Sequence, residues 1–337
     1  MHLHRYRARC YALSPFASQC LNLIVAANGR AGVNWEHAWG DGVAVLYYFN
    51  EVFAASGAMP ARAPSAPTRA EPARLQWHLD DGAALAAIRT AESSFDATIG
   101  ATQLRVYRSE ALKKADIKAS RLSPDGVMQM ALQLAYARAH RRLRSGGSAP
   151  STYESASTAG FKYGRTETIR VATAESVAFC AAFNRGDGAP DDAELVNRYI
   201  ALSAAASRHS ERAREAATGR GVDRHLFALR TWCARLARGA PPPAIFSNAA
   251  HSIFNDIGLS TSTLESPALE GGGFGPVNRT SYGVGYGVEE RGAHFHVMNY
   301  AGGDCDAATF TAGLETALRD ISAAIDAARR AGALGKK

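Results

Sequence analysis

The first apolar positions of the chain predict two short strands followed by a helix. Residues 21–27 form a continuous apolar run interrupted only by Asn22, and Asn28-Gly29 follows as a dipeptide typical of tight turns. A second strand is expected to end at Trp35. From residue 43 to residue 53, apolar side chains recur at helical spacing, which places a helix directly after the second strand.

Residues 54–75 change character and are expected to be a linker or a long surface loop. Alanine, serine and arginine dominate there, and prolines recur at Pro60, Pro64, Pro67 and Pro72. Beyond them, residues 75–79 are typical of a strand. Residues 80–99 are typical of a helix with Leu85 and Ile88 on one face.

The remainder of the chain alternates between helical and strand patterns. Ser123-Pro124-Asp125 has the residues of a helix start, and the apolar positions after it predict a core helix. Residues 193–218 form another long helical pattern. Apolar residues alternate with glycines over 284–288, and residues 293–300 are the expected partner strand.

A closing amphipathic helix is marked by Leu314, Leu318, Ile321 and Ile325. Strand and helix patterns therefore mix along the whole chain. The predicted fold class is α/β, with a mixed sheet and flanking helices.

Composition narrows the classes of partner only slightly. The 337 residues suffice for one large or two ordinary domains, and the net charge of +7 suits a polyanionic small ligand as well as a nucleic acid. Five scattered cysteines, an odd number, favour reduced thiols over a disulfide framework or a zinc site. No apolar run approaches ~18 residues, so no transmembrane helix is predicted. The first acidic residue is Glu36, and the arginine-bearing segment before it is weakly like an organelle transit peptide.

The pattern His37-x-x-x-Asp41-Gly42 is the first candidate for chemistry. A neutral imidazole can take a proton from an alcohol or thiol and return it, and a nearby carboxylate can hold the ring or the turn around it. His37 is expected just past the second strand, where a side chain can face a cleft. The alternative is a histidine near a turn with no chemical role.

Three of the six lysines of the chain lie close together. They are Lys113, Lys114 and Lys118, and the last two are spaced to point the same way on a helical turn. Such a pair suits a phosphate. The alternative is an ordinary solvated charged face.

Hydroxyl-bearing and charged residues gather in residues 152–170, where aromatic side chains among them favour a polar ligand surface. Arg224 follows a glycine-containing turn, and arginine is well suited to bind a carboxylate. Ser260-Thr261-Ser262-Thr263 offers a row of hydroxyl donors. His294-x-His296 is an alternative candidate for a metal site, because alternating residues of a strand face the same side, but no cysteine or acid at ligand spacing completes the set.

These blocks together resemble the carnitine/choline acyltransferase family, in particular its long-chain mitochondrial branch. The resemblance runs from about Leu21 to the C-terminus in family order. It is carried by His37-Ala-Trp-Gly-Asp-Gly-Val-Ala-Val-Leu46, Leu122-Ser-Pro-Asp125, Thr152-Tyr-Glu-Ser155, Gly164-Arg-Thr-Glu-Thr-Ile-Arg170, Asp223-Arg-His-Leu-Phe-Ala-Leu-Arg230, Leu259-Ser-Thr-Ser-Thr263 and Phe274-Gly-Pro276.

The resemblance implies a chloramphenicol acetyltransferase-like fold of two similar domains with the active site between them. Family members are much longer, and most of their N-terminal half has no counterpart here. Residues 1–58 would be the end of an incomplete first domain, residues 59–75 a linker, and residues 76–337 the second domain with the CoA and carnitine sites.

The resemblance also implies roles for the catalytic residues and for those that bind carnitine. His37 would be the general base, Asp41 would position it, and Ser262 would stabilise the oxyanion. Carnitine and the acyl chain would be bound by Tyr153, Ser155, Thr166, Arg224, Phe274 and Gly272. Among these, Phe274 would lie beside the trimethylammonium group, and Gly272 would leave a tunnel open for a long acyl chain.

For CoA, the resemblance implies that Lys114 and Lys118 face the 3′-phosphate and that Asp125 and Glu154 make further contacts. The expected activity is reversible transfer of a long-chain acyl group between CoA and L-carnitine in fatty acid β-oxidation. The alternative is an inactive truncated fragment that retains only CoA binding. CoA and carnitine are expected as substrates, with no resident cofactor or metal and no nucleic acid partner. The expected location is the mitochondrion, in peripheral association with the matrix side of the inner membrane.

Overall fold

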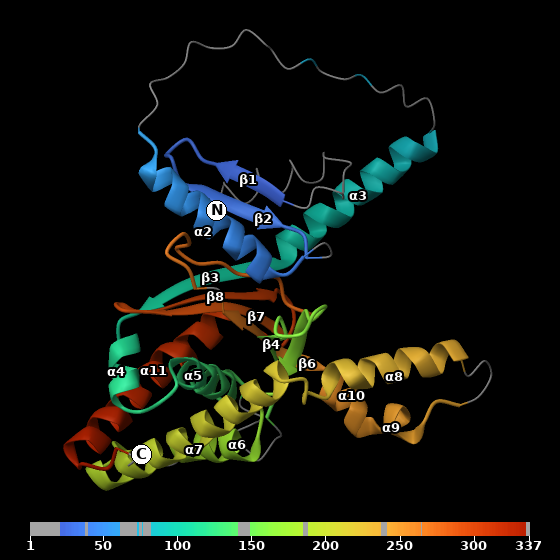
Figure 1. The fold of residues 1–337 in the computed structure, drawn as a ribbon. Helices are drawn as coiled ribbons and strands as arrows, with labels where there is room; N and C mark the ends of the chain where they lie inside the picture. Colours follow the sequence, from blue (N-terminus) through green and yellow to red (C-terminus); the bar gives the residue numbers. More distant parts are fainter. Residues whose placement is uncertain are drawn as a thin grey trace. The chain divides into compact units, whose positions relative to one another are not determined.

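The computed structural model describes residues 21–37, 40–60, 73, 76, 82–140, 149–184, 188–236, 241–263 and 265–334. These residues divide into two compact units (Figure 1). The first comprises residues up to Thr102 together with Ser266–Glu270, and the second comprises Gln103–Glu265 and Gly271–Lys337. The division falls between Thr102 and Gln103, and not in the proline-containing segment 59–75. The assignment of family domains to these units stays a prediction.

The first unit contains the predicted strand pair. β1 (Leu21–Val25) and β2 (Ala31–Trp35) are antiparallel, with Leu21 opposite Trp35. The turn between them depends on Gly29, whose φ of 79° lies in the left-handed region that favours glycine. The expected two strands and turn are confirmed.

Two helices complete the first unit, and they bury little. α2 (Gly42–Ala58) buries Val45, and α3 (Gly82–Ala101) buries none of its residues. The apolar stripe predicted around Leu85 and Ile88 is present but exposed. The helix predictions are therefore confirmed, while the burial that an apolar stripe normally implies is not.

Several predicted segments lie outside the described residues. They are the transit-like residues 1–20, most of the linker and all but Gln76 of the strand expected at 75–79.

The second unit is built on a six-stranded mixed sheet. Its strands, in spatial order, are β3 (Thr102–Ser109), β8 (Gly292–Tyr300), β7 (Tyr282–Glu289), β6 (Ile257–Thr263), β4 (Ser151–Ser157) and β5 (Thr166–Ile169). β6 runs parallel to both β4 and β7, whereas the β7–β8 and β4–β5 pairs are antiparallel. The α/β class with a mixed sheet is confirmed. The pattern did not predict β3, because this edge strand is largely exposed and lacks a continuous apolar face.

Three long helices pack together against one side of this sheet: α5 (Pro124–Ala139), α7 (Asp192–Ala217) and α11 (Ala307–Arg330) (Figure 1). The predicted helix start is confirmed, since the Ser123 hydroxyl accepts a hydrogen bond from the Gly126 amide at 3.2 Å. Met130 and Leu134 are completely buried, as expected for a core helix. The shorter helices α4 (Lys114–Ala119) and α6 (Ala174–Phe183) complete the helical layer.

Strand alternation gives the sheet two chemically different faces. The helical face carries side chains that touch the helices, such as Thr152, Glu154, Thr261, Tyr286 and Phe295. The polar face carries the residues between them, namely Tyr153, Ser155, Ser262, Gly283, Gly285, Gly287, His294 and His296.

Glycines on β7 let the segment Gly271–Gly275 lie directly on the polar face. A Cβ atom added to Gly285 would approach the carbonyl oxygen of Gly272 to 2.1 Å. A Cβ atom added to Gly283 would approach the carbonyl oxygen of Phe274 to 2.6 Å. The alternation of apolar residues with glycine in this strand thus serves two purposes: core packing on one side and close backbone approach on the other.

Candidate functional site

Three of the residues predicted to bind carnitine meet at the start of helix α8 (Asp223–Leu236). The Nη2 of Arg224 donates to the Tyr153 hydroxyl at 3.2 Å and to Oγ1 of Thr166 at 3.0 Å. Its Nε donates to the Thr166 carbonyl oxygen at 3.3 Å. The structure therefore brings together three side chains from three elements, a strand in the sheet, an edge strand and a helix, around one guanidinium.

Arg170 holds the first residue of α8 in place, and sequence reasoning missed it. Its guanidinium donates to both carboxylate oxygens of Asp223, to Oγ of Ser151 at 2.9 Å and to the Phe254 carbonyl oxygen at 2.8 Å. It also lies 3.7 Å from the centre of the Phe254 ring. Because Asp223 directly precedes Arg224, this contact fixes where the Arg224 side chain begins. The only signal in the sequence was a pair of opposite charges in two neighbouring motifs.

Ser155 and Ser262 lie side by side on the polar face, with their hydroxyl oxygens 3.3 Å apart. Ser155 is two residues from Tyr153 on β4, so both side chains point the same way. The residue predicted to stabilise the oxyanion thus adjoins those predicted to bind carnitine. Thr168, opposite Ser155 on β5, adds a buried hydroxyl with no hydrogen-bond partner among the described residues. It was not among the predicted site residues.

Phe274 and Gly272 lie on the segment that crosses the polar face. Phe274 is half-buried, and Gly272 is exposed. A Cβ atom at Gly272 would meet no atom of the described residues within 4 Å. A larger side chain would therefore have space at Gly272, whereas none would fit at Gly285 beneath it.

The two lysines predicted to bind phosphate lie on one short helix, as their spacing indicated. Lys114 begins α4, and Lys118 is one turn further along. The ammonium of Lys114 is 2.6 Å from a carboxylate oxygen of Glu265. An incoming phosphate would compete with this carboxylate for Lys114.

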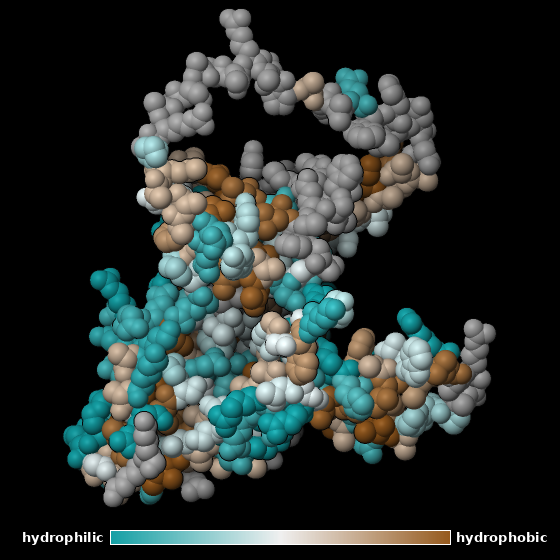
Figure 2. Space-filling view, in the orientation of Figure 1, coloured by the Kyte–Doolittle hydropathy of each residue, from teal (hydrophilic) through white to brown (hydrophobic). Residues whose placement is uncertain are grey.

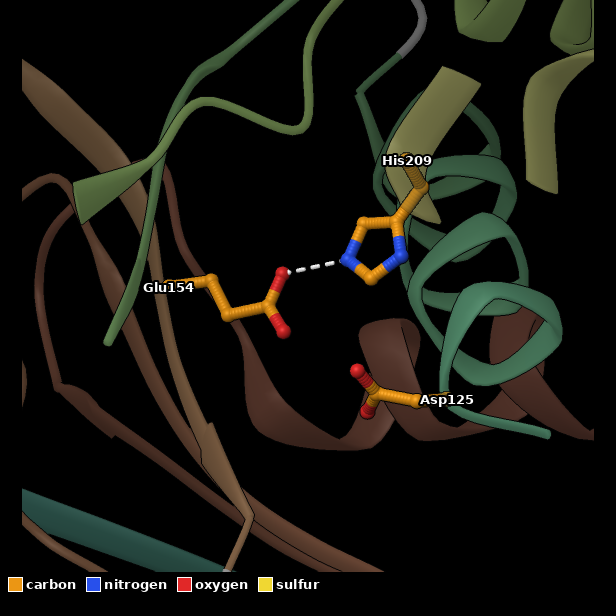
Figure 3. Close-up of side chains that lie close together, drawn as sticks. All are labelled: Asp125, Glu154 and His209. Atoms are coloured by element: carbon orange, nitrogen blue, oxygen red, sulfur yellow. Dashed lines mark hydrogen bonds and ion pairs between the residues drawn. The ribbon is translucent and has the colours of Figure 1, made fainter. Parts of the chain in front are cut away.

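Asp125 and Glu154, predicted as CoA contacts, point toward one another and toward His209 (Figure 3). Oε2 of Glu154 lies 2.7 Å from Nε2 of His209 on α7, and both side chains are buried. Asp125 accepts a hydrogen bond from the Tyr286 hydroxyl at 2.6 Å. Glu154 therefore lies on the helical face, opposite Tyr153, and not beside the carnitine residues. Sequence reasoning missed His209, which occupies an ordinary position in a long helix.

Burial and mutual contact shift the titration of this pair. Burial raises the pKa of Glu154 to about 7, although the hydrogen bond from His209 opposes the rise. Burial lowers the pKa of His209, but the hydrogen bond and charge of Glu154 outweigh it, so the net direction is upward. The pair thus holds a proton near neutral pH.

The donor atoms of Asp125, Glu154 and His209 lie within 4.8 Å of one another, the only such group in the described part of the chain. The alternative metal site at His294 and His296 is not supported. His294 is bonded instead to Glu289, with Nδ1 and Oε1 2.9 Å apart, and no third ligand joins the two histidines among the described residues.

The predicted base belongs to the first unit. His37 lies two residues beyond the end of β2, as expected, and its ring centre is 4.6 Å from that of Trp35. Asp41 occupies the N-cap position of α2, with its Oδ1 3.7 Å from Nδ1 of His37. The strand-to-helix junction predicted for this motif is confirmed.

The comparison with known families accords with this geometry. The family model described as Choline/Carnitine o-acyltransferase matches residues 9–318. The chain belongs to this family. It is 40% identical over 310 residues to Carnitine O-palmitoyltransferase 2, mitochondrial, of Homo sapiens, covering 90% of this chain and 45% of the human protein. The relative of the same name from Xenopus tropicalis is 40% identical over 293 residues, covering 86% of this chain and 43% of that protein.

A more distant relative is the muscle isoform of Carnitine O-palmitoyltransferase 1 from Sus scrofa, 31% identical over 331 residues, which cover 93% of this chain and 41% of that protein. The chain thus spans less than half the length of the curated relatives it matches. Among solved structures, the wax ester synthase/diacylglycerol acyltransferase from Marinobacter aquaeolei VT8 matches with a TM-score of 0.33 and 10% identity, covering 68% of this chain and 49% of that one.

Proposed function

We propose that this protein is a carnitine O-acyltransferase that moves a long-chain acyl group reversibly between CoA and L-carnitine. The observation that carries the proposal is the cluster of Arg224, Tyr153 and Thr166 beside the hydroxyls of Ser155 and Ser262. The 40% identity to a human carnitine O-palmitoyltransferase supports the same substrates.

The Arg224 cluster suits the carboxylate end of carnitine. A guanidinium offers two parallel donors to a carboxylate, and the Tyr153 and Thr166 hydroxyls that now accept from it could turn to donate to the same anion. Phe274 would contact the trimethylammonium group through a cation–π interaction.

In the proposed reaction, His37 takes the proton of the carnitine hydroxyl. The freed oxygen attacks the thioester carbonyl of acyl-CoA, and Ser262 donates a hydrogen bond to the oxyanion that forms, worth about 3 kcal/mol by analogy with other such donors. The carbon–sulfur bond then breaks, and the leaving CoA sulfur receives the proton from His37. Asp41, 3.7 Å from the His37 ring, would hold that ring in orientation.

For CoA, Lys114 and Lys118 are proposed to bind the 3′-phosphate, with the phosphate replacing Glu265 at Lys114. Asp125, half-buried at the start of α5, is a further proposed contact. For Glu154, a direct contact would require CoA to reach the helical face, because the carboxylate is buried there against His209.

Chain-length preference is proposed to depend on Gly272, where a side chain would have open space. Each buried CH₂ contributes about 0.8 kcal/mol, so an unobstructed path favours long acyl chains. Gly272→Met is expected to shift the kcat/KM profile across acetyl-, octanoyl- and palmitoyl-CoA toward the short chain. An unaltered profile would refute this role.

The second candidate is a protein that binds CoA without catalysing transfer. It is supported by the placement of the proposed CoA contacts Lys114, Lys118 and Asp125 in one unit, which does not contain His37. For either function, the names of the relatives support a mitochondrial location. Peripheral association with the matrix side of the inner membrane is part of the proposal, and no helix among the described residues is long and apolar enough to cross a membrane.

The deciding experiment incubates the purified chain with palmitoyl-CoA and L-carnitine and follows the release of the CoA thiol. Turnover that disappears in His37→Ala, with the circular dichroism spectrum unchanged, supports the enzyme. Calorimetric binding of CoA without turnover supports the second candidate. Activity retained in His37→Ala would refute the assignment of the base.

A further inference from the structure

Glu265 lies at the proposed CoA site and carries a negative charge, as the ligand does. Its Oε1 is 2.6 Å from Nζ of Lys114, a residue 151 positions earlier in the chain. Glu265 follows the last residue of β6 by two positions, and Lys114 is the first residue of α4. The fold of the second unit thus holds a carboxylate of the chain itself at the lysine proposed to bind phosphate.

The charges around α4 are almost balanced before Glu265 is counted. Figure 2 shows a mostly hydrophilic surface over this helix, at the left of the view. Residues 110–125 contain four cationic and three acidic side chains: Lys113, Lys114, Lys118, Arg121, Glu110, Asp116 and Asp125. Glu265 makes the two numbers equal. While Glu265 stays at Lys114, this region therefore offers an incoming anion little net attraction.

The ion pair between Lys114 and Glu265 is accessible to solvent and therefore weak. Of the two side chains, that of Lys114 is 26% exposed and that of Glu265 is 45% exposed. Water and salt screen a pair this exposed, so it changes an equilibrium by up to about fivefold. A phosphate monoester carries about 1.5 to 2 negative charges at pH 7, more than a carboxylate. Such a phosphate can displace Glu265, at the cost of breaking the existing pair.

We propose that Glu265 is a built-in competitor of the CoA 3′-phosphate, which weakens CoA binding and speeds CoA release. In the free protein Glu265 occupies Lys114. When CoA binds, the phosphate takes this place and Glu265 turns to solvent. When the phosphate withdraws, Glu265 returns and neutralises Lys114. This inference rests on the proposed function, because it requires that Lys114 binds the 3′-phosphate.

The opposite role for Glu265 would be to hold Lys114 in position for the ligand. In that role Glu265 would stay bound to Lys114 in the complex, and its removal would weaken CoA binding. The geometry favours competition, because Glu265 contacts the same Nζ atom that the phosphate must reach, and two anions at one ammonium repel each other. The two roles predict changes of CoA affinity in opposite directions.

The test is calorimetric titration of the purified chain and of Glu265→Gln with CoA and with dephospho-CoA, which lacks the 3′-phosphate, at low ionic strength. Glu265→Gln should bind CoA about two- to fivefold more tightly than the parent chain, because the phosphate no longer displaces a carboxylate. Its affinity for dephospho-CoA should equal that of the parent. The gain should appear as slower CoA dissociation in surface plasmon resonance and should shrink as salt is added.

A double-mutant cycle shows whether the effect passes through Lys114. In a Lys114→Gln background, Glu265→Gln should change CoA affinity little, because no ammonium remains for which the two anions compete. Glu315→Gln is the matched control, since it removes the same charge from a similarly exposed ion pair, with Arg319 on α11. It should bind CoA as the parent does.

Unchanged or weaker CoA binding by Glu265→Gln would overturn the proposal, and so would an equal gain in affinity for dephospho-CoA. The single variant Lys114→Gln separates this failure from failure of the proposed CoA site. If Lys114→Gln lowers the affinity for CoA but not for dephospho-CoA, the phosphate assignment stands although the competitor role falls. If Lys114→Gln changes neither affinity, the phosphate assignment and the competitor role fall together.

Discussion

The two faces of the six-stranded sheet are formed by the same strands but differ in role: one is buried against the helices, and the other carries the residues proposed to bind substrate. On β4, Thr152 and Glu154 turn toward the helices and are buried, whereas Tyr153 and Ser155, one residue away, carry the proposed carnitine contacts. On β7, Tyr286 fills the core and Gly285 supports another segment of backbone. An offset of one residue therefore separates the groups that stabilise the fold from those proposed to bind substrate.

The two faces also differ in how their polar side chains are hydrogen-bonded. On the helical face, Gln129 donates to Thr261 at 2.9 Å and to Tyr286 at 3.0 Å, and Gln133 donates to Thr152 at 3.0 Å. Such buried bonds rigidify the strands from behind. On the polar face, the hydroxyls of Ser155 and Ser262 contact each other and remain partly exposed, as groups that meet a ligand should.

Among variants that test the difference between the two faces, His209→Ala is expected to have the largest effect, on the stability of the helical face. It leaves the buried Glu154 carboxyl without its hydrogen-bond partner and creates a cavity, which should lower the free energy of unfolding by about 3–5 kcal/mol. Denaturant unfolding followed by circular dichroism measures it. Ser157→Ala, exposed at the end of the same strand, is the control. A loss below about 1 kcal/mol for His209→Ala would show that the helical face does not depend on this pair.

On the polar face, Arg224→Asn should weaken the binding of carnitine while leaving the fold intact. A charge-assisted hydrogen bond contributes about 1.5–3 kcal/mol, so carnitine affinity should fall roughly 10- to 100-fold. Calorimetric titration with carnitine and with CoA measures both ligands, and CoA affinity should stay the same. Equal losses for the two ligands would contradict a role specific to carnitine.

A smaller effect on both properties is expected from Gly285→Ala. Its Cβ would approach the Gly272 carbonyl oxygen to 2.1 Å, so the crossing segment must move, at a cost of about 1–3 kcal/mol. Thermal unfolding measures this cost. Gly272→Ala, which enters open space, is the matched control. Equal stability of the two variants would show that the segment is not held against β7.

The smallest expected effect is the dependence of the free energy of unfolding on pH. The pKa of Glu154 is raised in the folded state to about 7 from its ordinary 4.5, and that of His209 is also raised, so the folded protein binds more protons than the unfolded chain. The stability from this pair is present below about pH 4.5 and is lost as the pH rises through about 7. Between about pH 5 and pH 8, the free energy of unfolding should therefore fall. Glu154→Gln should flatten this dependence; a slope that persists in that variant would assign it to other groups.

The sequence alone predicted much of this fold. Continuous apolar runs, the Asn28-Gly29 turn, the Ser123 helix start and the alternation on β7 depend on neighbours within a few residues, and all are present in the structure. Motif order also indicated which side chains to inspect, and the structure brought Tyr153, Thr166 and Arg224 together. Local pattern sufficed because turn, cap and alternation are short-range effects.

Only the tertiary structure decided the side-chain contacts and the burial that depend on residues far apart in the sequence. No local pattern predicts the contact of Glu154 with His209, 55 positions further along the chain, which the register of β4 creates; the contact of Glu154 with CoA stays a prediction. The pairing of Arg170 with Asp223 joins residues 53 positions apart. The burial of an apolar stripe is likewise undetermined by its spacing, since α5 is completely enclosed over much of its length while α3 and α8 are exposed. Periodicity specifies which side of an element is apolar; whether that side is covered depends on elements that the local sequence does not encode.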